Sequence, residues 1–240
     1  MLTPAIRAVG FDLDDTLCVY LPVAIRARHQ VFQEILQPLI GLDVDAFDQH
    51  YRQAFKTMYS EIQSERWYPH YLRSGSATRT ETFRRMLGLL GLPSDGLAEQ
   101  VSERYAQLRE QHLHLHEDAL PVLTALKTRY PLLVVTNGPA YEQRRELQVL
   151  GIEPLFDGVA IEGEVGIGKP NVEIFRYAES LIGVPPEQIL FVGNSWEHDV
   201  QGALNAGWQA VWLNREGVEP PHAEPSVPMI SSLHELLEGI

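Results

Sequence analysis

Cysteine is almost absent from this chain of 240 residues, with Cys18 as the single example. One cysteine excludes an intramolecular disulfide and leaves the redox compartment open. Long apolar runs are missing too, since none reaches the roughly 20 residues that a membrane-spanning helix needs. The first residues lack a charged region followed by an apolar stretch, so we expect no signal peptide. A cytoplasmic protein without a membrane partner is therefore expected.

Basic side chains are also scarce, with 19 Lys and Arg against 32 Asp and Glu and a formal net charge of −13. A negative surface repels nucleic-acid phosphates and anionic membranes, so we expect no nucleic-acid partner. A small anionic ligand stays compatible, because a local cluster of positive charge can oppose the overall field. A hydrophobic content of 45% and a charged content of 21% are ordinary for a globular protein with a sizeable core. Nothing in the composition indicates an oligomeric state.

Short apolar runs alternate with helical periodicity along the second half of the chain. We expect strands at Ile6 to Leu13, Pro131 to Val135, Gly158 to Ile161, Ile189 to Val192 and Ala210 to Leu213. Helices are expected between them, at Ala119 to Thr128, Tyr141 to Leu150, Val172 to Leu181 and Asp199 to Ala206. This alternation is typical of a parallel sheet covered on both faces. The sequence therefore predicts an α/β fold with a doubly wound parallel sheet, a Rossmann-like core.

The first strand is followed by a long stretch with helical periodicity only. Phe47, Tyr51, Phe55 and Met58, for example, keep one face of a helix. The segment 67–76 breaks the periodicity and is expected to be a loop. We therefore predict an all-helical cap at 19–116, inserted into a core formed by 1–18 and 117–240. A proline-rich surface loop is expected at 216–228, before a last helix.

Two aspartates stand at the end of the first predicted strand, in the run from Phe11 to Leu17. Side chains alternate faces along a strand, so we expect Asp12 and Asp14 to point the same way. Two close carboxylates repel unless a cation or a shared proton offsets their charge. The pair therefore indicates a site for a cation or a reacting phosphate, although solvated turn carboxylates are the plainer alternative.

Three further polar segments are expected at the same edge of the sheet. They are Thr136-Asn137-Gly138, the segment from Gly166 to Asn171 with Lys169 ahead of a helix, and Gly193-Asn194-Ser195 leading to Asp199. Each alone has a plain alternative as a turn or a surface charge. Ligands of open parallel sheets bind outside the carboxyl ends of the strands, so four such segments together predict a functional site there.

In order and spacing these segments resemble the four motifs of the haloacid dehalogenase superfamily, most of whose members are phosphatases. The first motif is similar to the run from Asp12 to Leu17 and the second to Thr136-Asn137-Gly138. The third is similar to Gly168-Lys169-Pro170 and the fourth to the run from Gly193 to Ala203. The resemblance covers nearly the whole chain and includes a helical cap after the first motif. It looks closest to capped phosphatases that act on sugar phosphates, nucleotides or acylneuraminate phosphates.

The resemblance implies a Mg²⁺-dependent phosphatase that acts on a small phosphorylated metabolite. Asp12 would attack phosphorus and form an aspartyl-phosphate, and Asp14 would protonate the leaving oxygen and later take a proton from water. The Thr136 hydroxyl and backbone N–H groups near it, those of Leu13 and Asn137 included, would hold the phosphoryl oxygens. Lys169 would bind the phosphate and balance the negative charge.

The resemblance also implies the Mg²⁺ ligands: the Asp12 carboxylate, the Asp14 main-chain carbonyl and a side chain of the fourth motif. The chain departs from the superfamily here, because Asn194 stands where an acid is usual. Either Asn194 or Asp199 is expected to supply this ligand, with lower metal affinity than two acids would give. Since the cluster is strongly negative without the cation, the metal is expected to be required for turnover.

Alternatives remain beside this interpretation. In the cap, Arg73 and Arg84 are candidates for binding an anionic part of the substrate, or they are surface charges. A haloacid dehalogenase, in which Asp12 attacks carbon, and a phosphomutase use the same fold, although Asp14 argues against the dehalogenase. A non-catalytic module that only accepts phosphate on an aspartate is a further class, but such receiver domains are about half this length and have no helical insert.

Overall fold

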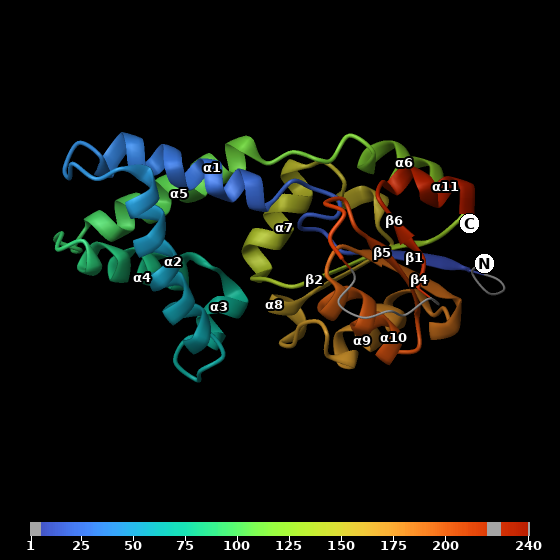
Figure 1. The fold of residues 1–240 in the computed structure, drawn as a ribbon. Helices are drawn as coiled ribbons and strands as arrows, with labels where there is room; N and C mark the ends of the chain where they lie inside the picture. Colours follow the sequence, from blue (N-terminus) through green and yellow to red (C-terminus); the bar gives the residue numbers. More distant parts are fainter. Residues whose placement is uncertain (1–5, 220–226, 240) are drawn as a thin grey trace.

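The computed structural model describes residues 6–219 and 227–239. Six strands form one sheet in the order β3-β2-β1-β4-β5-β6, and all neighbouring pairs are parallel (Figure 1). The strands are β1 Ala8–Phe11, β2 Leu132–Thr136, β3 Gly158–Ile161, β4 Ile189–Gly193, β5 Gln209–Leu213 and β6 Met229–Ile230. The strand order reverses between β1 and β4, and such a switch point is where open α/β sheets bind ligands. The predicted α/β fold class is confirmed.

The sheet is buried on both faces because its residues alternate between two hydrophobic clusters. In β2, Leu132 and Val134 face one cluster, while Leu133 and Val135 face the other. The first cluster includes residues of α6 (Ala119–Lys127), α7 (Ala140–Val149) and α11 (Leu236–Gly239), and the second includes residues of α9 (Val172–Ile182) and α10 (Gly202–Asn205). Near-continuous apolar strands are the expected consequence of such two-sided burial.

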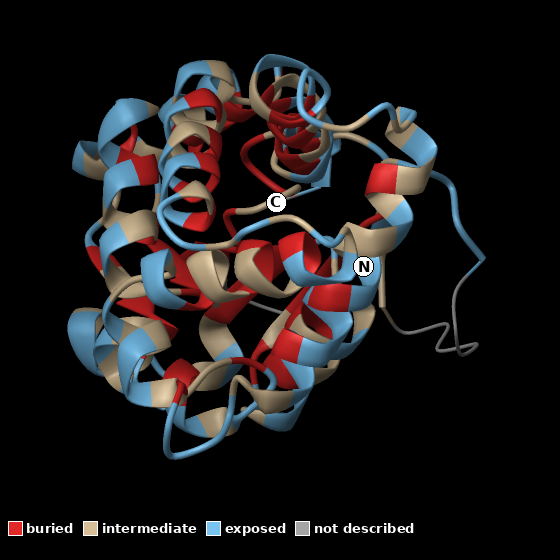
Figure 2. Cartoon of the chain, turned by 90° about the vertical axis from the view of Figure 1, so that its left-hand side faces the viewer, coloured by how far each residue is buried: buried red, intermediate tan, exposed pale blue. Residues whose placement is uncertain are grey.

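A separate group of helices follows β1 and lies at the left of Figure 1. These helices are α1 Leu21–Val31 with the π-helical turn Phe32–Leu36, α2 Val44–Glu61, α3 Tyr68–Arg73, α4 Ser76–Leu89 and α5 Leu97–His112. All of them except α3 contribute residues to a separate hydrophobic cluster. Figure 2, which looks onto this group, shows buried residues on the inner faces and exposed residues outside. We call this group the cap; its boundary as a domain at 19–116 stays a prediction.

Two segments that join the cap to the core run side by side. The Val19 N–H donates to the His114 carbonyl at 3.0 Å, and the His116 N–H donates to the Leu17 carbonyl at 3.0 Å. At the entry to the cap, Asp15 has a φ of 58°, which few residues other than glycine adopt. Its carboxylate accepts hydrogen bonds from the first backbone N–H groups of the cap. The start of the cap is therefore fastened directly to the loop that carries Asp12 and Asp14.

The structure differs from the sequence prediction in three short elements. Helix α3 lies in the segment expected to be a loop; it has Pro69 in its first turn and is too short to show a periodic pattern. Strand β6 was not predicted, because two residues give no alternation. The helix expected from Asp199 begins earlier, as the π-helical turn Trp196–Gln201.

Two further expectations concern the proline-rich loop and the lack of a membrane-spanning helix. Most of the predicted loop at 216–228 lies outside the described residues, since 220–226 are among those left out. Within 6–219 and 227–239, no helix is both long enough and apolar enough to cross a membrane.

Candidate active site

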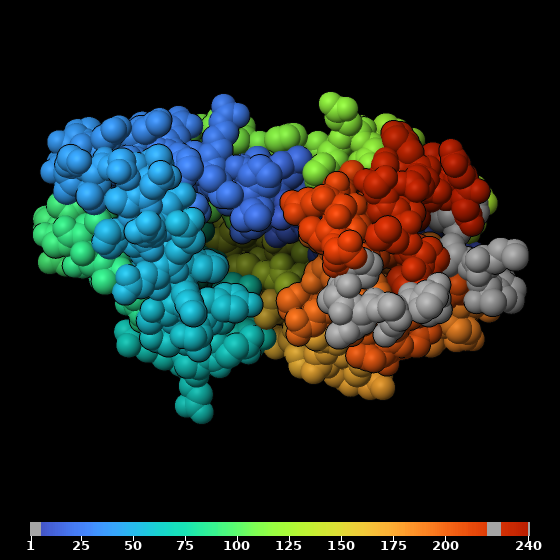
Figure 3. Space-filling model, viewed as in Figure 1, coloured from blue at the N-terminus to red at the C-terminus, as the bar shows by residue number. Residues whose placement is uncertain are grey.

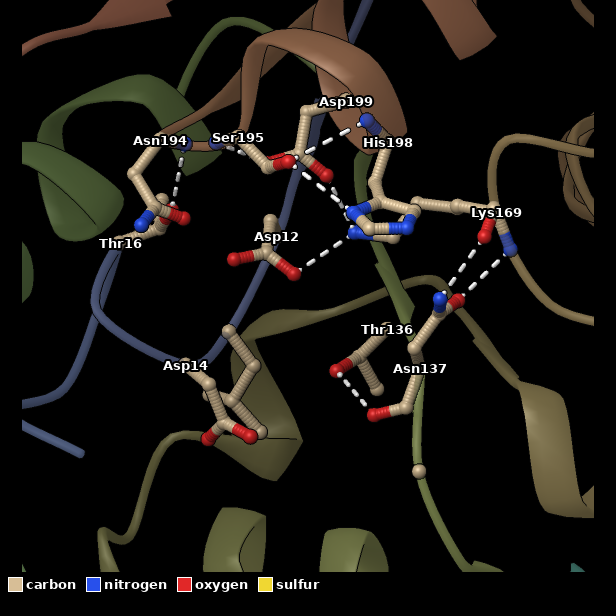
Figure 4. Close-up of polar contacts among 12 residues, drawn as sticks. Asp12, Asp14, Thr16, Thr136, Asn137, Lys169, Asn194, Ser195, His198 and Asp199 are labelled. Carbon is tan, nitrogen blue, oxygen red and sulfur yellow. Dashed lines mark hydrogen bonds and ion pairs between the residues drawn. The ribbon is translucent and has the colours of Figure 1, made fainter. Parts of the chain in front are cut away.

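Lys169 stands at the centre of a buried cluster at the carboxyl ends of the strands (Figure 4). Its Nζ donates to Asp12 Oδ1 at 2.7 Å and to Asp199 Oδ1 at 2.6 Å. Asp12 directly follows β1, and Asp199 lies in the π-helical turn after β4. The three side chains are nearly inaccessible, so solvent and salt screen their attraction only weakly. The structure thus brings together three of the predicted site residues.

The loop that carries Lys169 is held by two asparagines. Asn137 Nδ2 donates to the Lys169 carbonyl at 2.9 Å, and Asn137 Oδ1 accepts from the Lys169 N–H at 2.7 Å. Just beyond, Asn171 caps α9 by accepting a hydrogen bond from the Glu173 N–H at 2.9 Å. The side chain of Asn137 therefore positions Lys169, and only its backbone N–H is left for a substrate.

The charges of the cluster depend on each other. Burial would lower the pKa of Lys169, but the carboxylates of Asp12 and Asp199 outweigh it and raise that pKa. Burial raises the pKa of Asp199 to about 6, although the Lys169 ammonium opposes this rise. The lysine therefore stays positively charged at neutral pH.

Asp199 is fixed by its own turn. The Ser195 N–H donates to Asp199 Oδ2 at 2.8 Å. The carboxylate packs so closely on the end of β4 that a Cβ at Gly193 would overlap it. Glycine is therefore required at this position for Asp199 to reach Lys169.

Asp14 lies apart from this cluster, against helix α7 (Figure 4). Gln143 Nε2 donates to Asp14 Oδ2 at 3.2 Å and to Glu146 Oε2 at 3.4 Å. Burial, followed by the neighbouring Glu146 and Asp12 carboxylates, raises the pKa of Asp14 well above its usual range. Strand alternation does not set its direction, because β1 ends at Phe11 and both aspartates lie beyond the regular strand. Strand alternation therefore does not support the expectation that Asp12 and Asp14 share a direction, and that expectation stays a prediction.

A cap residue reaches the same network from the other side. Arg109 of α5 donates to Glu146 Oε1 at 2.7 Å and to the Tyr20 hydroxyl at 2.9 Å. The sequence did not predict Gln143, Glu146 and Arg109 as site residues, because the contact between Arg109 and this pair depends on how α5 packs against α7. One pattern in the sequence could have indicated buried polar groups here. Gln143 and Glu146 are three positions apart and lie on the same side of α7 as the buried Leu147.

Unpaired donors surround the space beside Asp12. The side chain of Leu13 is buried in the core, and its backbone N–H has no acceptor among the described residues. The backbone N–H of Asn137 is likewise unpaired there. The hydroxyl of Thr136, which is 1% exposed, donates to Gln143 Oε1 at 2.8 Å. Two backbone donors are therefore available for an anion, whereas the Thr136 hydroxyl could bind one only by exchanging its present bond.

The comparison with known proteins agrees with this geometry. A family model described as haloacid dehalogenase-like hydrolase matches residues 6–207. The chain belongs to this family.

Its relatives are similar along nearly their whole length. The chain is 33% identical to human N-acylneuraminate-9-phosphatase over 96% of this chain and 92% of that protein. It is 30% identical to glyceraldehyde 3-phosphate phosphatase of Methanopyrus kandleri over 98% of this chain and 97% of that protein. The crystal structure of the HAD-hydrolase YfnB from Bacillus subtilis, bound to magnesium, has a TM-score of 0.73 at 22% identity and covers 98% of both chains. The last comparison shows likeness of fold.

Membership of the haloacid dehalogenase-like hydrolases implies a Mg²⁺ site, and several oxygen atoms near Asp12 are candidates for its ligands. Asp12 Oδ2 and the Asp14 main-chain carbonyl accept no hydrogen bond from a described residue. The exposed Asn194 has its Oδ1 at 3.2 Å from the Thr16 hydroxyl. In the described part of the chain, no group of three or more His, Cys, Asp or Glu side chains lies close enough together to hold a metal ion by itself. Two carboxylates, those of Asp12 and Asp199, together with amide and carbonyl oxygens nevertheless fit Mg²⁺, which prefers oxygen ligands.

The two cap arginines named from the sequence are not brought to the site. Arg84 pairs with Glu81 and Glu99 at 2.7 and 2.6 Å, and the exposed Arg73 donates to a backbone carbonyl of its own helix. Neither lines the cavity next to Asp14, whereas Arg79 does. Arg79 and Arg84 stand five positions apart, which turns them about 140° away from each other on α4. The helical phase therefore explains why the cap presents a different arginine.

Proposed function

We propose that this protein is a Mg²⁺-dependent phosphatase that hydrolyses a small phosphorylated metabolite through an aspartyl-phosphate at Asp12. The observation that supports this proposal most directly is the environment of the Asp12 carboxylate. One of its oxygens is 2.7 Å from the Lys169 ammonium, and the other accepts no hydrogen bond from the described residues. A carboxylate held in this way, beside unpaired N–H donors, is suited to attack an anionic centre. The two curated relatives described above, both named as phosphatases, support the proposal.

In the first half-reaction Asp12 attacks phosphorus. A bond forms between the Asp12 carboxylate and phosphorus while the bond from phosphorus to the alcohol oxygen breaks. Asp14 gives a proton to that oxygen, so the alcohol leaves neutral. Lys169 and the N–H groups of Leu13 and Asn137 hold the negative charge of the phosphoryl oxygens in place.

In the second half-reaction a water molecule attacks the phosphorus of the aspartyl-phosphate. Asp14 takes a proton from this water, and the bond between phosphorus and the Asp12 oxygen breaks. Inorganic phosphate leaves, and Asp12 is again a carboxylate. One group, Asp14, therefore serves as acid in the first half and as base in the second.

Mg²⁺ would be held by the Asp12 carboxylate, the Asp14 main-chain carbonyl and Asn194 or Asp199. When bound, it supplies positive charge against the phosphoryl oxygens. The cap closes over the site and excludes bulk water during the transfer. The cytoplasmic location and the lack of a nucleic-acid partner stay predictions from the sequence.

The haloacid dehalogenase alternative is less well supported. In that reaction Asp12 attacks carbon, and no acid is needed at the position of Asp14. Here Asp14 is a hydrogen-bonded carboxyl that faces the space between cap and core. A phosphomutase shares the nucleophile and stays an alternative that the products distinguish, because it transfers the phosphoryl group to a second hydroxyl instead of to water.

The test is release of inorganic phosphate from p-nitrophenyl phosphate, with Mg²⁺ and with a chelator. We expect activity with Mg²⁺ only, and a loss of roughly a thousandfold or more in kcat for Asp12→Asn. Asp95→Asn, at an exposed position of the cap, is the matched control and should match the parent. Parent-like turnover by Asp12→Asn, or activity that survives the chelator, contradicts the proposal. Release of halide from a haloacid instead of phosphate from esters supports the dehalogenase.

A further inference from the structure

Two hollows lie near the loop that follows β1, and only one of them is lined by a catalytic aspartate, Asp14. A cavity of about 300 Å³ lies between cap and core and is lined from the core by Asp14, Asn137 and Gly138. A larger hollow of about 1280 Å³ opens beside Asn194. Figure 3 shows one face of the molecule, which is recessed between cap and core. Because Asp14 protonates the leaving oxygen in the proposed mechanism, the alcohol must lie in the smaller cavity, which we call the leaving-group cavity.

One wall of the leaving-group cavity is a row of aromatic rings on α2. Tyr51, Phe55 and Tyr59 follow each other at four-residue spacing, so they share one face of the helix. The ring centroids are 6.0 Å apart for Tyr51 and Phe55, and 5.9 Å apart for Phe55 and Tyr59. Phe55 is 48% exposed and Tyr59 is 62% exposed. Such exposed rings form a surface on which a ligand ring can stack.

The two cations that line this cavity already have carboxylate partners. Arg79 lies 3.4 Å from Glu142, and Arg109 lies 2.7 Å from Glu146. Glu142 also accepts hydrogen bonds from the Ser74 hydroxyl and the backbone of the next residue, which holds the first pair in place. Both lining cations are therefore paired, and none is left among the described lining residues to neutralise a second anion.

The remaining polar groups of the leaving-group cavity are neutral hydroxyls and amides. Burial raises the pKa of Tyr51 and Tyr71, so both phenols stay protonated at neutral pH. Thr78 and Thr82 of α4 and Gln143 of α7 add further uncharged hydrogen-bonding groups. This lining favours an uncharged polar ligand with an apolar ring face.

We propose that the substrate is a phosphate monoester of an uncharged, ring-bearing alcohol, whose ring stacks on the Tyr51–Phe55–Tyr59 wall. The inference rests on the phosphatase activity proposed above and adds the chemical class of the leaving group. Phosphate esters that carry a second anion, such as a carboxylate, are poor substrates because their charge would lie beside the Glu142 carboxylate while both lining arginines are already paired.

The first experiment compares two esters of equal shape. With Mg²⁺ present, kcat/KM is measured for p-carbamoylbenzyl phosphate and p-carboxybenzyl phosphate, which differ in charge but hardly in size. We expect the neutral ester to be better by roughly tenfold or more, given the cost of placing an unpaired charge in the cavity. Equal values, or a preference for the carboxylate, overturn the inference. The Glu142→Gln variant removes the carboxylate partner of Arg79, so the ratio of kcat/KM for the neutral ester to kcat/KM for the charged ester should fall.

The second experiment tests the aromatic wall. Phe55→Ala should raise KM for the carbamoylbenzyl ester by roughly fivefold, since one stacking partner is lost, and should leave the values for ethyl phosphate near those of the parent. Tyr177→Ala is the matched control, because Tyr177 is 41% exposed and lies on α9 of the core. Equal losses for both esters, or no loss for either, exclude the α2 wall as the ring site.

A binding measurement separates failure of this inference from failure of the proposed function. Titration calorimetry with Asp12→Asn protein and Mg²⁺ reports ligand affinity without turnover. If the parent hydrolyses neither ester while this variant prefers the neutral one, the phosphatase proposal falls and the cavity inference stands. If the parent hydrolyses both alike, the inference falls and the phosphatase proposal stands. If neither turnover nor selective binding is found, both fall.

Discussion

The side chains after β4 bear on how strongly the proposed site would hold a cation. Asn194 offers a neutral oxygen at the strand end, and Asp199 already accepts hydrogen bonds at both of its carboxylate oxygens. Carboxylates bind Mg²⁺ more strongly than amide oxygens because they carry charge. If Mg²⁺ binds here as proposed, the candidate ligands after β4 are a neutral amide and a carboxylate that already pairs with Lys169.

This arrangement predicts opposite effects for two substitutions. Asn194→Asp should lower the Mg²⁺ concentration needed for half-maximal activity by roughly tenfold, since it adds a charged oxygen ligand. Asp199→Asn should raise that concentration. Both values come from activity measured across a Mg²⁺ titration. Unchanged metal dependence in Asp199→Asn removes Asp199 from the site, and unchanged dependence in Asn194→Asp removes Asn194.

Another residue, Asp118, which is not among the proposed metal ligands, is expected to make stability depend on pH. Asp118 accepts hydrogen bonds from two Arg215 nitrogens, the Ser232 hydroxyl and the Leu233 N–H. Although burial opposes it, these partners lower the pKa of Asp118 to about 2. A lowered pKa means that the folded state prefers the ionised carboxylate, so its contribution is full above the ordinary pKa of about 4 and is lost as the pH falls towards 2.

The Asp118→Asn variant should therefore lose about 2 kcal/mol of the free energy of unfolding at neutral pH. This difference from the parent should shrink as the pH falls from about 4 to about 2. Urea denaturation at a series of pH values measures both quantities. Asp95→Asn, at an exposed position, is the control and should change little. A difference that stays constant down to pH 2 contradicts this account of Asp118.

The site residues differ in how far the sequence alone could place them. Asp12, Thr136 and Lys169 stand directly at strand ends or a helix start, so local patterns and the parallel sheet were sufficient to bring their segments together. Gln143 and Arg109 could not be predicted in the same way, because their contacts depend on the packing of α7 against α5. The prediction for Arg84 failed because the sequence pattern did not fix the phase of α4, and the prediction for Arg73 failed because this residue lies on α3, a helix that the sequence did not predict.

At the scale of elements, α9 holds the Lys169 loop through its first turn. Asn171 accepts a hydrogen bond from the Glu173 N–H, which satisfies one of the free donors at the helix start. Asn171→Ala should lower the free energy of unfolding by about 1 kcal/mol, while Asn171→Gly should cost only a few tenths. Chemical denaturation of both variants measures this difference. Equal losses for Ala and Gly contradict a capping role.

Elements marked by an apolar run or by helical periodicity were predicted better than elements without such a pattern. The strand Gly158–Ile161 and the helix from Val172 were placed by their apolar runs and flanking glycines. Helix α3 was missed because six residues do not complete two turns of a periodic pattern. Strand β6 pairs with β5 through only two positions, and nothing local marks it. Tertiary pairing, which the sequence pattern does not contain, decides such elements.

At the scale of the whole molecule, the fold brings the proposed nucleophile and its partners from distant segments to one edge of a sheet. Asp12 and Lys169 are separated by 157 positions, and yet they are 2.7 Å apart. The cap reaches the same edge through Arg109, so the chemistry is enclosed between two parts of the chain. The proposed phosphatase mechanism, and with it the proposed substrate class, depends on Asp12 acting as the nucleophile.

The most direct measurement is therefore to trap the phosphoryl group on the protein. The parent enzyme is mixed with Mg²⁺ and a radiolabelled ester, quenched in acid within the first turnover, and digested for peptide mapping by mass spectrometry. The account predicts a phosphoryl group on Asp12 that appears and decays as fast as phosphate is released. Steady release of phosphate with no protein-bound phosphoryl group, or with one on a different residue, contradicts it.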